Sequence, residues 1–173
     1  MKAVDSTASS LNDMELMGSG DAYKETLCEI IEALPLLANF SSTEVKLLAN
    51  YMLAYRVCQG TTIFEEGSRD RFMAFVSSGH LQVYKEGEPG EQHELAIVRP
   101  GMSIGEMSLL DNQPHSATVI ASEETELLVL SGEKFQKLEE KFPHLAFKML
   151  WIISLMLSNR LRKTSGILVD YLG

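Results

Sequence analysis

The residues of this sequence that suit chemistry lie close together, in residues 100–119. Gly105 and Glu106 begin a stretch of one or two helical turns that interrupts a strand-rich region. A glycine at the start of a short helix lets a ligand approach the backbone, and the exposed N–H groups there favour an anion. The Glu106 carboxylate suits a pair of hydroxyl donors, such as those of a ribose. These residue types therefore indicate recognition of a small polar ligand.

His115 and Ser116 return the chain to the same expected site with a protonatable ring and a hydroxyl. A histidine is charged only below a pKa of about 6.5, so its contribution depends on its surroundings. Taken alone, the pair Gly105-Glu106 is more simply interpreted as a turn with a solvated carboxylate. The elements around the segment must decide between the two interpretations.

The sequence contains residue types that can support catalysis, but they are not arranged in any known catalytic motif. The sequence has no nucleophile pattern, phosphate-binding loop or dinucleotide fingerprint. A metal site in a barrel of the cupin type needs clustered histidines, including an H-x-H pair. The histidines form no such pair; they are His80, His93, His115 and His144. We therefore expect no enzyme activity, no catalytic residue, no bound metal and no cofactor.

The composition excludes several partners. The 173 residues include 24 acidic and 15 basic side chains, which gives a net charge of −9. A nucleic-acid-binding surface needs a basic face, so we expect no DNA binding by this chain alone. The sequence shows no signal peptide, and the apolar run from Met149 to Leu157 is too short to span a membrane. Cys28 and Cys58 favour two reduced, buried thiols, so we expect a cytoplasmic protein without membrane contact.

Short β-prone runs surround the segment, between Leu53 and Leu130, and glycine turns separate them. Several short strands at close spacing favour a sandwich, barrel or roll. Helical periodicity precedes and follows them, and Ser41 with Glu44 offers a capping box. The tail is expected to be flexible, with at most a short helical stretch near Leu16. The expected organisation is tail 1–21, helices 22–50, strands 51–131 and C-terminal helices 132–173.

With these elements the chain resembles the cyclic-nucleotide-binding domain family, which includes bacterial catabolite activator protein, kinase regulatory subunits and cyclic-nucleotide-gated channels. The resemblance covers roughly residues 34–165. It is carried by the glycines at 60, 67 and 79, the run Ile63 to Gly67, Pro100-Gly101, Ile104 to Leu109, and Pro114 to Val119. It implies a mainly β fold with flanking α-helices in one domain, 22–173. The strands form a double-stranded β-helix (a jelly-roll-like β-roll), followed by a long C-terminal dimerisation helix.

The resemblance also implies a phosphate-binding cassette, residues 104–119, that takes cAMP or cGMP. Glu106 is expected to hold the ribose 2′-hydroxyl, with backbone amides around Gly105 to Met107 nearby. Ser116 is expected to touch the phosphate. Arg160 and Thr164 of the C-terminal helix are expected to close over the base. The full set of expected ligand-binding residues is Gly105, Glu106, Met107, Ser108, His115, Ser116, Ala117, Arg160 and Thr164.

His115 departs from the family pattern, which has an arginine that pairs with the cyclic phosphate. Arginine offers a permanently charged planar fork, whereas much of a histidine population is neutral at pH 7. Losing one partner of a buried charge pair costs roughly 2–5 kcal/mol. The sequence therefore leaves two hypotheses. The first is a regulatory, signal-transducing sensor with a separate protein effector, since the chain ends at Gly173 without a helix-turn-helix segment. The second is a degenerate fold that serves as a dimerisation or protein-interaction scaffold.

Apolar residues of the last helix repeat at alternating spacings of three and four, which is typical of two helices packed side by side. We expect a homodimer through this seam, whereas the alternative is a helix that covers only its own domain. Trp151, Ile152 and Met156 lie off the seam and are expected to pack back onto the strands. The seam residues are Leu150, Ser154, Leu157, Leu161, Thr164 and Leu168.

Overall fold

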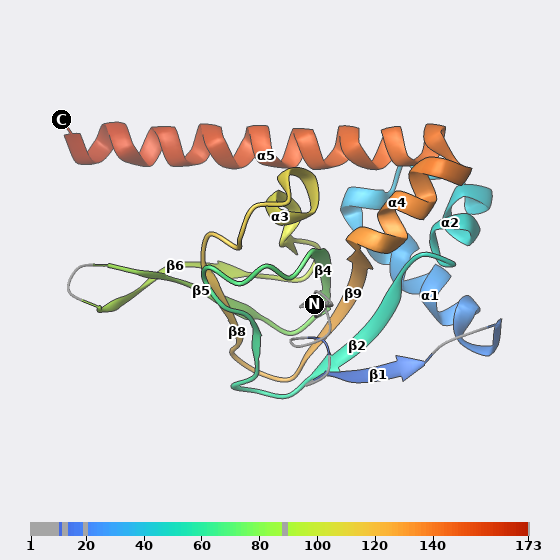
Figure 1. Cartoon of the computed structure of the whole chain (residues 1–173), viewed down its shortest axis with the longest axis horizontal. Helices are drawn as coiled ribbons and strands as arrows, with labels where there is room; N and C mark the ends of the chain where they lie inside the picture. Colours follow the sequence, from blue (N-terminus) through green and yellow to red (C-terminus); the bar gives the residue numbers. More distant parts are fainter. Residues whose placement is uncertain (1–10, 12–13, 19–20, 88–89, 173) are drawn as a thin grey trace, which may run out of the picture. The chain divides into compact units, whose positions relative to one another are not determined.

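The computed structural model of the chain describes residues 11, 14–18, 21–87 and 90–172 (Figure 1). The chain divides into two compact units, residues 1–135 and residues 136–173. All strands and the cassette belong to the first unit.

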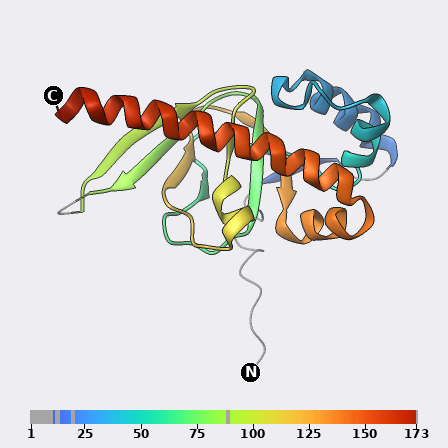
Figure 2. The same ribbon diagram turned by 90° about the horizontal axis from the view of Figure 1, so that it is seen from above.

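Two antiparallel sheets form the first unit, and the chain passes back and forth between them several times. The five-stranded sheet has the order β1 (Glu15–Gly18), β2 (Leu53–Val57), β9 (Thr125–Ser131), β4 (Phe72–Ser78) and β7 (Ser103–Ile104). The four-stranded sheet has the order β3 (Thr62–Phe64), β8 (Thr118–Ala121), β5 (Leu81–Glu86) and β6 (Gln92–Val98). The β5–β6 hairpin, in light green, extends beyond the rest of its sheet in both views (Figures 1 and 2). The expected mainly β fold with flanking helices is confirmed.

Side chains from both sheets build the core of this unit. Phe64 on β3, Leu81 on β5 and Val119 on β8 pack with Phe72 and Val76 of β4. Every residue from Phe72 to Val76 is fully buried, which explains the unbroken apolar run of β4. This core fixes the strands that flank the cassette on both sides.

The N-terminal helices are α1 (Asp21–Ala33), the 3₁₀ helix η3 (Pro35–Leu37) and α2 (Ser42–Leu48). The expected capping box is confirmed at the start of α2. The Glu44 N–H donates to Ser41 Oγ over 3.3 Å, and the Ser41 N–H donates to Glu44 Oε2 over 2.7 Å. Two otherwise unpaired backbone donors are satisfied in this way.

The segment around Leu16 is a strand, so the expectation of a flexible tail with at most a helical stretch is wrong there. Glu15 pairs with Arg56 and Leu16 with Tyr55, which adds β1 to the edge of β2. A partner some forty positions away decides this pairing, and local propensity cannot anticipate it. The rest of the predicted tail, residues 1–10, 12–13 and 19–20, lies outside the described residues. Cys58, which was expected to be buried, is exposed just after β2.

The second unit contains most of α4 (Gly132–Lys141) and all of α5 (Pro143–Leu172). The Phe142 N–H donates to the Leu138 carbonyl over 2.7 Å, and the Leu145 and Ala146 N–H groups donate to the Phe142 carbonyl. These bonds join the end of α4 to the start of α5. None of the helices in the described part of the chain has the length and apolarity needed to cross a membrane.

Candidate functional site

The first arm of the cassette is the short helix α3 (Glu106–Asp111), and Gly105 sets its start. Gly105 has a φ of +73°, and a Cβ placed there would lie 2.4 Å from the carbonyl oxygen of Phe72. Two features therefore disfavour any residue other than glycine here: the left-handed backbone conformation and the close contact with β4. The helix start is held directly against the core strand.

Glu106 follows at once and is buried, with 2% of its surface exposed. Ser108 is also buried, and its hydroxyl donates to the Gly105 carbonyl over 3.0 Å. The Leu109 N–H donates to the same carbonyl over 3.3 Å. Ser108 thus stabilises the first turn of α3, whereas Met107 lies on the exposed side of the helix.

The end of α3 is held by a side chain that the sequence analysis did not single out. Arg71 donates from Nη2 and Nε to the Leu109 carbonyl, over 3.2 and 3.4 Å. A cation at the C-terminal end of a helix satisfies a free carbonyl and complements the helix dipole. Its sequence position next to Phe72, 38 residues before Leu109, gave no signal of this contact.

The second arm of the cassette begins at His115 and runs beside the turn after β3. The His115 N–H donates to the Ser68 carbonyl, and the Gly67 N–H donates to the His115 carbonyl, each over 2.8 Å. These two bonds fix the backbone of His115 in an antiparallel arrangement with residues 67–68. The glycine that the family resemblance noted at 67 has a φ of +82°, which the turn requires.

The His115 ring is buried between aromatic side chains. It stacks on Phe64 with 3.7 Å between ring centroids and 7° between planes, and it meets the edge of Phe72 at 5.9 Å. Burial lowers the pKa of the imidazole, and a hydrogen bond to the backbone of Asp70 and the Asp70 charge oppose that change without reversing it. The ring is therefore neutral at pH 7, whereas the resemblance described above implies a charged arginine at this position.

Phe72 connects the two arms. Gly105 approaches its carbonyl oxygen, and His115 approaches its ring. The structure thus brings together the two halves of the cassette, which are separated in sequence by α3 and the loop that follows it. Phe64 and Phe72 were not predicted as site residues, because buried aromatic residues in strands have the same pattern whether or not they border a site.

A pair of charges lies beside Ser116. The Ser116 side chain is exposed, and its carbonyl accepts a hydrogen bond from Lys85 Nζ over 2.8 Å. Lys85 also forms an ion pair with Glu66, and this contact is the main reason why the pKa of Glu66 is lowered. Ala117, next in the chain, is half-buried. Lys85 lies 31 residues before Ser116, and only the pairing of β5 with β8 brings them together.

Arg160 and Thr164 belong to the second unit, so their expected contact with the base stays a prediction. In the predicted seam, Ser154, Leu161 and Thr164 are exposed, whereas Leu150 and Leu157 are half-buried. The side chain of Leu168 lies outside the described part of the helix. The Ser154 hydroxyl donates to the Leu150 carbonyl over 2.8 Å, so it is satisfied within α5.

Trp151 does not pack back as expected. It is 60% exposed, with Phe147 at 63% and Leu155 at 49%, whereas Ile152 and Met156 are buried. The repeat that predicted the seam begins at Phe147, and the four-residue spacing places Trp151 and Leu155 in one stripe with it, beside the later seam residues. The exposed apolar face of α5 is therefore broader than the predicted seam.

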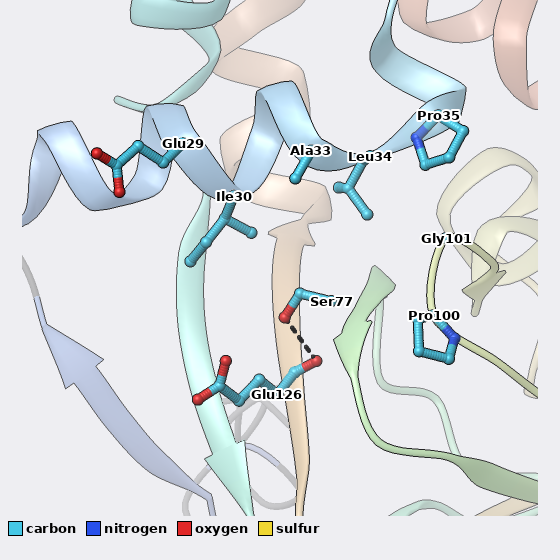
Figure 3. Close-up of a pocket in the computed structure, with 9 residues that line it drawn as sticks. All are labelled: Glu29, Ile30, Ala33, Leu34, Pro35, Ser77, Pro100, Gly101 and Glu126. Carbon is cyan, nitrogen blue, oxygen red and sulfur yellow. Dashed lines mark hydrogen bonds between the residues drawn. The ribbon is translucent and has the colours of Figure 1, made fainter.

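A hollow of about 480 Å³ lies elsewhere in the first unit, below α1 (Figure 3). It is bordered by Ile30, Leu34, Ser77, Pro100 and Glu126 among others, and no cassette residue lines it. The Ser77 hydroxyl donates to the Glu126 carbonyl across its floor. Within the described residues, no group of His, Cys, Asp or Glu side chains is arranged to hold a metal ion.

A β-roll with a buried carboxylate behind a left-handed glycine defines a ligand-sensing domain. The chain belongs to the cyclic nucleotide-binding domain family, whose model matches residues 55–142. Membership in this family makes the chain a regulatory module.

Two relatives are similar to this chain in sequence. The chain is 33% identical over 129 residues to the cyclic AMP receptor protein of Thermus thermophilus, covering 75% of this chain and 58% of that protein. It is 32% identical over 108 residues to the cAMP-dependent protein kinase regulatory subunit of Yarrowia lipolytica, covering 62% of this chain and 28% of that protein. The chain thus spans less than two thirds of the length of either relative.

Two solved structures have a fold similar to that of this chain. A cyclic nucleotide-binding domain from Methylobacillus flagellatus matches with a TM-score of 0.83 and 27% identity, over 98% of this chain and 97% of that one. The catabolite activator protein of Thermus thermophilus matches with a TM-score of 0.67 and 33% identity, over 80% of this chain and 62% of that one. The β-roll architecture is thus shared with both.

Proposed function

We propose that this chain is a non-enzymatic sensor that binds a cyclic nucleotide, or a closely related ligand, in the cassette. The observation that carries the proposal is Glu106, a carboxylate with only 2% of its surface exposed, at a helix start that Gly105 holds against β4. Burying a carboxylate costs free energy, which hydrogen-bond donors or a paired charge must offset. A ribose diol offers the donors that such a group accepts.

The remaining contacts follow from the same geometry. Backbone N–H groups from Gly105 to Met107 lie at the start of α3 and suit the polar end of a ligand. Ser116 offers an exposed hydroxyl, and its carbonyl is already used by Lys85. Arg160 and Thr164 close over the base in this proposal. The names of the relatives from Thermus thermophilus and Yarrowia lipolytica both mention cyclic AMP, which makes cAMP the first ligand to test and cGMP the second.

A specific observation favours a second candidate function, a scaffold without a nucleotide ligand. His115 stacks on Phe64 inside the protein, so the position that carries the phosphate-binding arginine in the family contributes to the aromatic core here. A site that had lost its ligand would retain this packing and would present no cation at His115. In that case dimerisation or protein interaction remains as the function.

The partners in this proposal are a second copy of the chain and a separate protein effector. The exposed apolar face of α5 supports the homodimer, because Phe147, Trp151 and Leu161 are each at least 60% exposed. Apolar side chains of this size in one stripe are typical of interaction surfaces. The net charge of −9 argues against DNA as a direct partner of this chain and is compatible with a cytoplasmic regulator.

Calorimetric titration of cAMP and cGMP into the protein at pH 6.0 and 7.5 tests the proposal. We expect binding of at least one of them with an affinity that falls in Glu106→Gln, since the amide accepts hydrogen bonds less strongly and offers no charge. His115→Arg is titrated alongside. Binding by neither the wild type nor His115→Arg would overturn the sensor and favour the scaffold.

A further inference from the structure

The hollow below α1 is a concave surface of the first unit that lies apart from the cassette (Figure 3). α1 covers it, and Ile30 and Leu34 point from this helix toward Ser77 of β4 and Glu126 of β9. Its volume of about 480 Å³ is within the usual range of sites that bind small groups in proteins. The proposed function makes no use of this surface.

One end of the hollow is apolar and is held in place by backbone hydrogen bonds. Pro35 and Pro100 lie at this end (Figure 3). The Gly101 N–H donates to the Val76 carbonyl, and the Val76 N–H donates to the Met102 carbonyl, each over 2.9 Å. A Cβ at Gly101 would lie 3.3 Å from Pro35 Cδ, so the loop packs closely against the start of η3. The apolar end is therefore preformed, and an apolar side chain binds there without first ordering this part of the chain.

The other end of the hollow carries two carboxylates, from Glu29 of α1 and Glu126 of β9 (Figure 3). Glu29 is exposed and forms no hydrogen bond or ion pair with the described residues. Glu126 accepts a hydrogen bond from Arg56 Nη2 at Oε1, over 3.3 Å, whereas Oε2 accepts none from the described part of the chain. Because carboxylate oxygens only accept, a group that binds here must donate, and a positive charge strengthens the bond.

The remaining polar groups of the hollow also disfavour an anion. The Ser77 hydroxyl already donates to the Glu126 carbonyl over 3.0 Å, so its hydrogen is not available to a phosphate or a carboxylate. The two glutamates are the only charged residues that border the hollow within the described residues. The sequence of α1 contains three glutamates and one lysine, which adds to the negative potential. A second nucleotide would therefore be repelled here, whereas a cation would be attracted.

We propose that the hollow is a docking site for a partner protein, which inserts a short segment that has an arginine or a lysine next to an apolar side chain. The cation lies between Glu29 and Glu126, and the apolar side chain packs on Leu34, Pro35 and Pro100. Long basic side chains suit such a site, because their methylene groups cover apolar surface while the charged group reaches the acids. An apolar anchor together with complementary charge is typical of protein–protein contacts.

The partner is the separate effector of the proposed function, and the inference rests on that function in this respect. The docking site shares no residue with the cassette, so peptide binding and nucleotide binding are measured independently. If no cyclic nucleotide binds but the peptide does, the sensor is overturned and the docking site stands. If a cyclic nucleotide binds but the peptide does not, the docking site is overturned and the sensor stands.

An NMR titration of the full chain with three synthetic tripeptides tests the proposal without any variant of the protein. The probe is acetyl-Leu-Arg-Leu-amide. One control, acetyl-Leu-Glu-Leu-amide, reverses the charge, and the other, acetyl-Ser-Arg-Ser-amide, removes the apolar anchors. We expect the probe to shift the methyl resonances of Ile30 and Leu34 and to bind at least about tenfold more tightly than either control. Unshifted methyl resonances, or equal affinity for the three peptides, would overturn the inference.

Two charge variants of α1 separate the docking site from the general charge of the helix. Glu29 and Glu32 are both exposed, but only Glu29 borders the hollow. Glu29→Lys should weaken binding of the probe about tenfold, whereas Glu32→Lys, with the same change in net charge, should weaken it less than about threefold. Equal weakening in the two variants would overturn the proposal. A change of oligomeric mass in Glu29→Lys would assign the hollow to a second copy of the chain and would overturn it as well.

Discussion

The rings of His115 and Phe64 lie parallel, with 3.7 Å between their centroids and 7° between their planes. The stack joins the second arm of the cassette to β3, and Phe72 completes it from β4. At the position where the resemblance implies a charged arginine, this chain has an aromatic cluster that contains one titratable ring. The consequences of His115 therefore extend to stability as well as to ligand choice.

The first prediction concerns stability and pH. Burial lowers the pKa of His115 below its usual 6.5, so the unfolded chain binds more protons than the folded chain between the lowered pKa and 6.5. Stability is therefore fully present above pH 6.5 and declines as the pH falls through the lowered pKa. Urea unfolding from pH 8 to pH 5 measures this decline, and His115→Phe should show a smaller one. Equal declines in the two proteins would show that His115 does not titrate differently on folding.

The second prediction concerns ligand binding and pH. Protonation gives His115 a charge and a second donor, so cAMP affinity should rise as the pH falls from 8 to 5, through the lowered pKa of the ring. Calorimetry in matched buffers measures this slope. His115→Arg is the control, since its charge is constant over this range and its cAMP affinity should be flat. A flat cAMP profile in the wild type would remove His115 from the site.

Local sequence patterns were sufficient to predict features that depend on residues close together in the sequence. The capping box at Ser41 was visible in the sequence, because it depends on residue types at a fixed offset. Gly105 was singled out as a point where a ligand approaches the backbone, whereas in the structure it is the Phe72 carbonyl that approaches there. The family resemblance then indicated a roll, which periodicity alone left open among a sandwich, a barrel and a roll.

Contacts between distant segments were not visible in the same way. The pairing of Leu16 with Tyr55 and the hydrogen bond from Lys85 to Ser116 depend on the register of strands that are far apart in the sequence. The burial of His115 depends on two phenylalanines that have the ordinary pattern of core residues. The exposure of Trp151 could not be inferred either, since a tryptophan near an apolar seam fits both the core and an interface.

The third prediction is that Gly105→Ala destabilises the fold and abolishes ligand binding. The new Cβ would meet a backbone oxygen of the core strand at 2.4 Å, and the φ of +73° is unfavourable for alanine. We expect a loss of about 2–4 kcal/mol in the free energy of unfolding. Gly60→Ala is a matched control, because Gly60 has a φ of +84° but no atom within 4 Å of the added Cβ. It should lose only about 1 kcal/mol, and similar losses in both variants would contradict the close approach to β4.

The fourth prediction is that α5 forms a homodimer through its exposed apolar face. The helix is buried on one side, at Met149 and Ile153, and carries exposed Phe147 and Trp151 on the other. A second copy would cover these side chains, and a buried charge in such an interface is strongly unfavourable. Sedimentation equilibrium should therefore give twice the monomer mass for the wild type and a monomer for Leu157→Glu.

A matched control separates this interface from a general effect of adding charge. Leu95 on β6 is 60% exposed, as Trp151 is, but lies in the other unit of the chain. Leu95→Glu should remain dimeric, whereas Trp151→Glu should shift the equilibrium toward monomer by at least tenfold in Kd, the equivalent of about 1.4 kcal/mol. If both remain dimeric while Leu157→Glu dissociates, the contact follows the narrow predicted seam. A monomeric wild type at every concentration tested would exclude α5 as a dimer interface.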